Sequence, residues 1–437
     1  MQKSGFQLIL FLFFAAFTQA GSYEPIDTAN LETRKKCSEH YQQHSNEILK
    51  SLAGNLKGKE AALYRDFYKE QQKTFREELL RGDYLFDGRF SSFTDSIVKR
   101  ILSANPDLPA DLLFYYSRNI SLNATSFGDK TFAINLGSYY YLDNEQQLAA
   151  MIAHEIAHYR FDHVREVWLS RHRTSKENAK NSLKQIRKTR YGRGNKALEH
   201  YRELLYADGA LNQRQEFEAD SLGYQLYKNA GYKPTEYLNL YQLMALYDTI
   251  NPTGVETDTY RKYFNLPTQA FREEWLKSED FSRYDYSLYK AKINEDSVGT
   301  HPQLKARIGR LTSIYPELAH PDSSSAASPG FKQLSDIARY ERLQSLDYNE
   351  DYGTGLYLCL LGLQHNDPDS TFLHRYMAKF LQKITDARAS YTLNRYVDRV
   401  DPVNQSPSYQ QFLNFIWNLK MNELKLIASH WNTTTKP

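Results

Sequence analysis

The chain has 437 residues, with 55 Lys or Arg against 52 Asp or Glu, so its formal net charge at pH 7 is +3. Hydrophobic residues make up 41% and Cys only 2 positions, which excludes a collagen, a wholly disordered chain and a disulfide-rich scaffold. The mean hydropathy of −0.66 argues against a polytopic membrane protein. The near-balanced charge gives no sign of a nucleic-acid binder.

The first 20 residues have the layout of a secretory signal peptide. Lys3 gives a positive start, an apolar run follows from Phe6 to Phe17, and small residues precede a cleavage site after Ala20. The run is shorter than the about 20 apolar residues that cross a bilayer. The sequence therefore predicts an exported protein, periplasmic or secreted, with an uncleaved anchor as the alternative.

Helical spacing of apolar residues predicts helices from Thr33 to about Leu80 and from Phe93 to Leu102. Alternating and β-branched residues then predict two strands, at Leu112–Tyr116 and Thr131–Leu136. A long helix is expected from Glu145 to about Val167, capped by Asp143 or Asn144. Later helices are expected at residues 213–230 and 301–311, separated by polar loops.

Two further segments differ from their surroundings. Residues 160–202 contain 13 Lys or Arg and four Asp or Glu, a net charge of +9. One interpretation of this cationic stretch is a pair of solvated helices. The other is a functional element, either a lid or a surface that binds acidic partners or anionic lipid. The Ser- and Pro-rich residues 321–330 predict a linker.

These features divide the chain into a signal peptide (1–20), an N-terminal helical region (21–110), a central domain (111–320), the linker (321–330) and a helical C-terminal domain (331–437). An Asn-Asp-Pro-Asp turn between apolar-striped helices in the last part resembles a tetratricopeptide unit, and a plain helical hairpin domain is the alternative. The sequence leaves open whether Cys37 and Cys359 form a disulfide.

The strongest chemical signal is His154-Glu155-Ile156-Ala157-His158 within a good helix-forming stretch. Residues i and i+4 lie on one face of a helix, so both imidazoles can reach one zinc ion. Glu155 then lies next to the ion, where it can take a proton from the attacking water. Two ordinary helix histidines are the alternative.

A catalytic zinc needs a third protein ligand. One known arrangement places Gly three and His six residues after the second histidine, but Phe161 and Val164 occupy those positions. A carboxylate on a later helix is the other arrangement, and Glu216 supplies it. Asp220 shares a helix face with Glu216 and can accept a hydrogen bond from a ligating imidazole. Glu218 points elsewhere and is rejected as a ligand.

A resemblance to a known family rests on the Asn123-Ala124 turn, residues 132–137, the helix ending in His158 and the Glu-x-x-Ala-Asp segment. The chain resembles the HtpX- and BepA-like gluzincin metallopeptidases, whose family also holds the CAAX prenyl proteases. The motif His301-Pro302 with Arg307 also matches. The resemblance implies a mainly α (α+β) domain with a small antiparallel sheet and an active-site helix. It also implies that His301 stabilises the oxyanion or caps the metal, with Arg307 in support.

The expected enzyme is a zinc metalloendopeptidase with one Zn²⁺ per chain, held by His154, His158 and Glu216. A zinc-activated water attacks the peptide carbonyl, and Glu155 acts as general base and then protonates the leaving amine. The predicted strand Thr131, Phe132, Ala133, Ile134 and Asn135 would hold an extended substrate by strand addition; an ordinary core strand is the alternative.

The expected substrates are misfolded polypeptides or proteins of the cell envelope. The assembly machinery of the envelope is an expected partner, and no nucleic acid is expected. Peripheral membrane contact would use residues 160–202. A chaperone-like assembly factor with a mostly capped protease site is the second hypothesis. A non-enzymatic scaffold with a fortuitous motif is the third.

Overall fold

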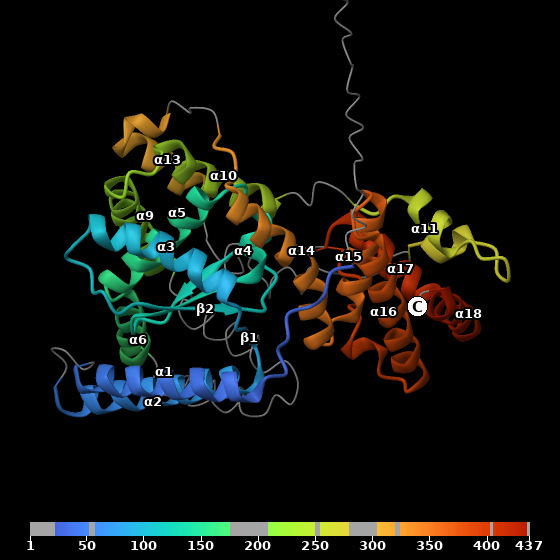
Figure 1. The fold of residues 1–437 in the computed structure, drawn as a ribbon, viewed down its shortest axis with the longest axis horizontal. Coiled ribbons are helices and arrows are strands. Elements are labelled where there is room, and N and C mark those ends of the chain that lie inside the picture. The colour runs from blue at the N-terminus through green and yellow to red at the C-terminus, as the bar shows by residue number, and fades with distance from the viewer. Residues whose placement is uncertain are drawn as a thin grey trace, which may run out of the picture.

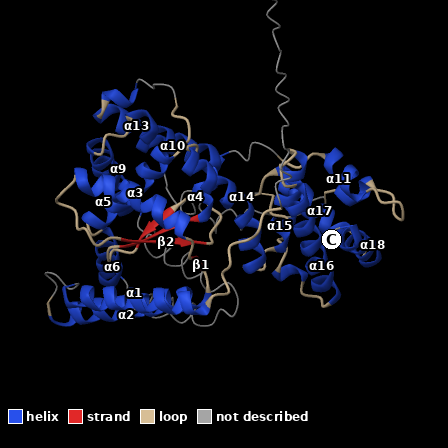
Figure 2. Cartoon of the chain, in the orientation of Figure 1, coloured by secondary structure: helices blue, strands red, loops and turns tan. Residues whose placement is uncertain are grey.

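The computed structural model describes residues 22–51, 57–174, 209–249, 254–278, 304–319, 324–402 and 405–434. Within them the chain forms two groups of helices, and the first group encloses one small sheet (Figures 1 and 2). The prediction of a mainly helical fold with a small sheet and a helical C-terminal part is confirmed. The predicted signal peptide, His301 and most of the cationic stretch lie outside the described residues.

The N-terminal helical hairpin consists of α1 (Leu31–Ser51) and α2 (Gly58–Arg81). Its inner face packs against the turn that precedes the last strand of the sheet, where Asp129 is almost fully buried. The hydroxyls of Tyr41 and Tyr68 both donate to the Asp129 carboxylate, which also accepts a hydrogen bond from the backbone N–H of Thr131. The hairpin thereby fixes the turn of the sheet.

The sheet contains β1 (Tyr84–Leu85), β2 (Leu113–Ser117), β3 (Ala124–Ser126) and β4 (Thr131–Asn135), in the spatial order β1-β2-β4-β3. It is mixed: β1 with β2 and β3 with β4 pair in antiparallel orientation, whereas β2 and β4 pair in parallel, which corrects the expectation of an antiparallel sheet at this one pair. A tight turn after β3 returns the chain between β3 and β2. β4 is therefore interior and every one of its residues is buried.

Two helices follow the sheet. α4 (Leu136–Tyr141) begins directly after β4. α5 (Glu145–Arg160) is capped by Asn144, whose side chain accepts from the backbone N–H groups of Gln146 and Gln147. The expected continuous helix to Val167 is interrupted, because Asp162 adopts a left-handed backbone conformation with φ 58°. α6 (His163–Thr174) then runs in a new direction.

Four helices and one short 3-10 turn complete the described part of the first group: α3 (Gly88–Ala104), α9 (Gly209–Asn229), α10 (Pro234–Thr249), α13 (Leu304–Ile314) and η4 (Pro316–Ala319). α9 packs along α5, and the two helices come very close at Gly223. A Cβ atom at this position would lie 3.0 Å from the Cα atom of His154 and 2.6 Å from the hydroxyl of Tyr237. The absence of a side chain at Gly223 therefore permits the crossing.

The second group has its own apolar core. Its elements are α11 (Thr257–Phe264), η1 (Glu273–Leu276), α14 (Pro329–Tyr348), α15 (Tyr352–Gln364), α16 (Ser370–Ala389), η5 (Leu393–Arg395), α17 (Pro407–Asn418) and α18 (Met421–Thr434). The N-terminal half of α14 belongs to the first core and its C-terminal half to the second, so this helix joins the groups (Figure 1).

Two sequence questions are answered in part. Cys37 and Cys359 are not bonded to each other. None of the described helices combines the length and the apolar character needed to cross a membrane. The proposed domain boundaries and the tetratricopeptide comparison stay predictions.

Replacing Gly223 with Ala tests the close crossing of α5 and α9. The added methyl group has no room beside His154, so we expect the metal-free protein to lose about 1–3 kcal/mol of unfolding free energy. Chemical denaturation measures this loss. Gly309→Ala is the matched control, because Gly309 is also helical and has nothing within 4 Å of its hypothetical Cβ. An equal response of the two variants would contradict the packing argument.

Candidate metal centre

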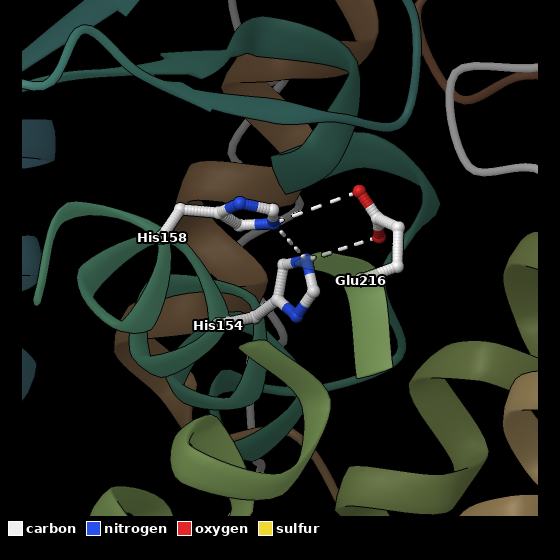
Figure 3. Close-up of side chains that lie close together, drawn as sticks. All are labelled: His154, His158 and Glu216. Carbon is white, nitrogen blue, oxygen red and sulfur yellow. Dashed lines mark hydrogen bonds and ion pairs between the residues drawn. The ribbon is translucent and has the colours of Figure 1, made fainter. Parts of the chain in front are cut away.

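Three side chains from two helices meet in the interior of the first group. His154 and His158 lie one turn apart on α5, and Glu216 faces them from α9 (Figure 3). The two Nε2 atoms are 3.0 Å apart, and the Glu216 carboxylate oxygens lie 3.5 Å from that of His154 and 3.6 Å from that of His158. All three residues are buried.

These separations fit one tetrahedral metal ion. Ligand atoms about 2.0–2.1 Å from zinc at tetrahedral angles lie about 3.3–3.4 Å from one another, which is close to the observed spacing. Two imidazoles and one carboxylate also form a donor set typical of catalytic zinc, which leaves a fourth position for a reactant. His154, His158 and Glu216 therefore fit zinc in both spacing and chemistry.

Asp220 lies one turn after Glu216 on α9 and faces the other ring nitrogen of His154. Its Oδ1 is 3.2 Å from His154 Nδ1 and accepts a hydrogen bond of 2.7 Å from the hydroxyl of Tyr241. Burial would lower the pKa of His154, but the hydrogen bonds with Asp220 and Glu216 outweigh it and raise this pKa to about 9. Without metal, the buried imidazole therefore carries a proton at neutral pH.

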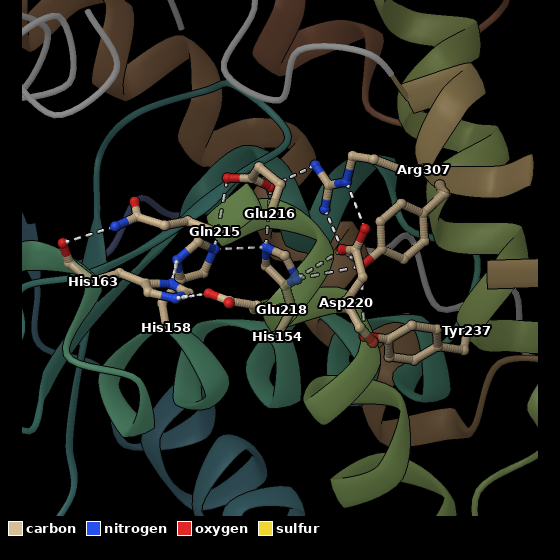
Figure 4. Close-up of polar contacts among 10 residues, drawn as sticks. His154, His158, His163, Gln215, Glu216, Glu218, Asp220, Tyr237 and Arg307 are labelled. Atoms are coloured by element: carbon tan, nitrogen blue, oxygen red, sulfur yellow. Dashed lines mark hydrogen bonds and ion pairs between the residues drawn. The ribbon is translucent and has the colours of Figure 1, made fainter. Parts of the chain in front are cut away.

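Arg307 on α13 joins both carboxylates of α9 (Figure 4). Its Nη1 lies 2.6 Å from Glu216 Oε2, while its Nε and Nη2 donate to Asp220 at 2.8 and 2.5 Å. Although burial raises the pKa of Asp220, Arg307 and the bonds from His154 outweigh that effect and the net pKa is lowered. Arg307 thus keeps Asp220 ionised, and it pairs with the carboxylates of both α9 residues.

His158 contacts a further histidine, His163. Its Nδ1 lies 2.9 Å from Nδ1 of His163, whose Nε2 is 3.3 Å from Glu218 Oε2 (Figure 4). Burial lowers the pKa of both His158 and His163. His163 and Tyr241 were not identified from the sequence. His163 lies only five residues after His158, but a continuous helix would have directed it elsewhere.

The structure changes one part of the predicted site. β4, residues Thr131–Asn135, has a strand on each side, β2 and β3. An extended substrate has no free edge of β4 to pair with, so the prediction that this strand binds substrate is wrong. Glu155 is buried on α5 between the two histidines. His301 lies outside the described residues, three positions before Leu304, the first residue of α13.

A comparison with protein-family models identifies residues 94–315, slightly more than half of the chain, as a match to Peptidase family M48. The chain belongs to peptidase family M48. M48 peptidases are zinc-dependent proteolytic enzymes, so the chain is a metallopeptidase, and the buried His-His-Glu cluster lies within the matched region. No curated protein sequence matches the chain.

Zinc binding should depend on pH through His154. Because its metal-free pKa is about 9, a proton competes with the metal below that pH. The apparent Kd for zinc should therefore rise by about tenfold for each pH unit lowered from 8.5 to 6.5. His158 has a lowered pKa and should add no second proton over this range. Competition titration with a chelator measures the slope, and a Kd independent of pH would contradict the assignment.

Proposed function

We propose that this protein is an exported zinc endopeptidase of the HtpX- and BepA-like branch of the M48 family, acting on misfolded or envelope proteins. The observation that carries the proposal is the meeting of His154, His158 and Glu216, with Glu155 on the same helix as the histidines. Support for export comes from the signal-peptide layout of residues 1–20.

Each described site residue has a defined chemical task. Zinc, when bound by His154, His158 and Glu216, supplies Lewis acidity that polarises the peptide carbonyl and lowers the pKa of the attacking water. Glu155 accepts the proton of that water on its carboxylate and delivers it to the leaving amine. Asp220 keeps the Nδ1 proton of His154 in place, and the burial of the cluster excludes bulk water.

The substrate strand is reassigned to the edge of the sheet. β3 (Ala124–Ser126) is bordered by β4 on one side only, among the strands of the described residues, and it packs beside α5. In its ladder, Asn123 and Phe127 bond to β4, so the N–H groups of Ala124 and Ser126 face the other way. We place the extended substrate along this edge, where its backbone would lie next to the metal centre.

The second group of helices is the proposed recruiting element for polypeptides or assembly partners. It is continuous with the peptidase part through α14, which contributes to both cores. His301 keeps its proposed role as oxyanion donor or metal cap, and residues 160–202 keep their proposed role toward acidic partners or a membrane surface. These assignments rest on the sequence alone.

Glu155→Gln separates catalysis from metal binding. The amide cannot accept the proton, so we expect cleavage of an unfolded protein substrate to fall by about 10²–10⁴-fold. Zinc content and thermal stability should match the wild type, because no ligand changes. Cleavage by gel or fluorescence assay and zinc by mass spectrometry decide the outcome. Retention of full activity by this variant would reject Glu155 as the base.

Ser126→Pro tests the edge strand. Proline removes the N–H that faces away from β4, and within sheets it is found at edge strands. Because Ser126 is buried, circular dichroism first establishes that the variant is folded. We expect KM for a long peptide to rise by about tenfold, the loss of roughly one backbone hydrogen bond. Ser126→Ala keeps the N–H and serves as the control. Equal KM values for the two variants would remove β3 from the substrate site.

A further inference from the structure

The break between α5 and α6 brings a third histidine to the metal centre. On a continuous helix, the residue five positions after His158 would lie about 140° around the axis from it. The left-handed conformation of Asp162 ends α5 and redirects the chain, so that His163, the first residue of α6, turns back toward His158. The result is the 2.9 Å contact between the two Nδ1 atoms (Figure 4).

His163 is enclosed on its other sides. It is 3% exposed, and the ring of Phe161 stacks on it at 5.4 Å between centroids and 15° between planes. The side-chain amide of Gln215 donates to its backbone carbonyl at 3.4 Å. Glu218 approaches Nε2 at 3.3 Å and is itself bound by Arg214 at 2.8 Å. The imidazole therefore has a fixed plane and fixed neighbours.

Metal binding determines which ring nitrogen carries the proton in His158 and in His163. If Nε2 of His158 binds the metal, its proton must sit on Nδ1, which then donates to Nδ1 of His163. His163 accepts that bond only as a neutral ring with its own proton on Nε2, which donates to the Glu218 carboxylate. Each polar atom in this series of hydrogen bonds is then either a donor or an acceptor. Glu218 fixes the tautomer of His163, and His163 in turn fixes the tautomer of His158.

We propose that His163 and Glu218 are positioning residues that hold His158 in the tautomer and orientation needed to bind zinc; this deepens the proposed function and rests on its metal set. The two ligating histidines are thus supported differently. His154 meets its carboxylate, Asp220, directly, whereas His158 meets Glu218 through the intervening ring of His163. Both carboxylates belong to α9, the helix that also provides Glu216.

His163→Leu tests the proposal. Leucine fills the space but offers no acceptor to His158, so we expect the Kd for zinc, measured against a competing chelator, to rise by about 10–100-fold. The Co²⁺-substituted variant should also show an altered visible spectrum, because the ring of His158 is free to turn. His163→Asn keeps an acceptor near the position of Nδ1 and should restore both the cobalt spectrum and a Kd within about threefold of the wild type.

Two controls separate positioning from folding. His374→Leu changes a partly buried histidine in the second group, stacked on Trp431, and should leave zinc affinity unchanged. The side chain of Glu218 is 36% exposed, so its substitution should not unfold the chain. Glu218→Ala should weaken zinc binding several-fold, whereas Glu218→Gln, which still accepts the bond from His163, should bind zinc like the wild type.

The outcomes are distinct. A folded His163→Leu variant with wild-type zinc affinity and an unchanged cobalt spectrum overturns the proposal. If that variant does not fold, as judged by circular dichroism, the Glu218 pair decides, and equal zinc affinity of its two variants overturns the proposal. His154→Ala and Glu216→Ala test the metal set itself. If these also keep wild-type zinc affinity, the metal set fails, whereas a loss of zinc confined to them rejects only the role of His163.

Discussion

The buried pairing of Arg307 with Glu216 and Asp220 is the interaction on which the metal centre depends. Two carboxylates one turn apart on α9 lie in an interior that excludes water, and each would repel the other if both were ionised. The guanidinium contacts both and offsets the cost of burying their charges. α13 must therefore pack over α9, which explains why a segment far along the chain belongs to the peptidase core.

The local part of the site could be predicted from sequence, because helical spacing alone brings His154 and His158, and likewise Glu216 and Asp220, onto shared faces. The tertiary part could not. The interior position of β4 depends on where a six-residue connection between β2 and β3 places the next hairpin, and alternation along one strand carries no information about its neighbours. His163 depends on one backbone conformation, at Asp162, where no glycine marks the turn.

The unusual number of tyrosines, 34, also becomes intelligible. Many of them are fully buried, and several direct their hydroxyls at buried carboxylates: Tyr41 and Tyr68 at Asp129, Tyr23 at Glu341, Tyr241 at Asp220. A tyrosine fills a core as phenylalanine does and still brings one donor to its far end. The chain uses this property at several of its buried acidic side chains, including Asp220 beside the metal ligand His154.

α9 connects these separate observations. One face of this helix presents Glu216 and Asp220 to the metal ligands, and Glu218, about 200° around from Glu216, reaches His163 on the side of α6. A single rigid helix thus sets one ligand and the supports of the other two. The close contact of Gly223 with the backbone of His154 fixes how near α9 lies to α5. A displacement of α9 would therefore disturb all three ligands together. The packing at Gly223 and the geometry of the metal ligands thus depend on the same position of α9.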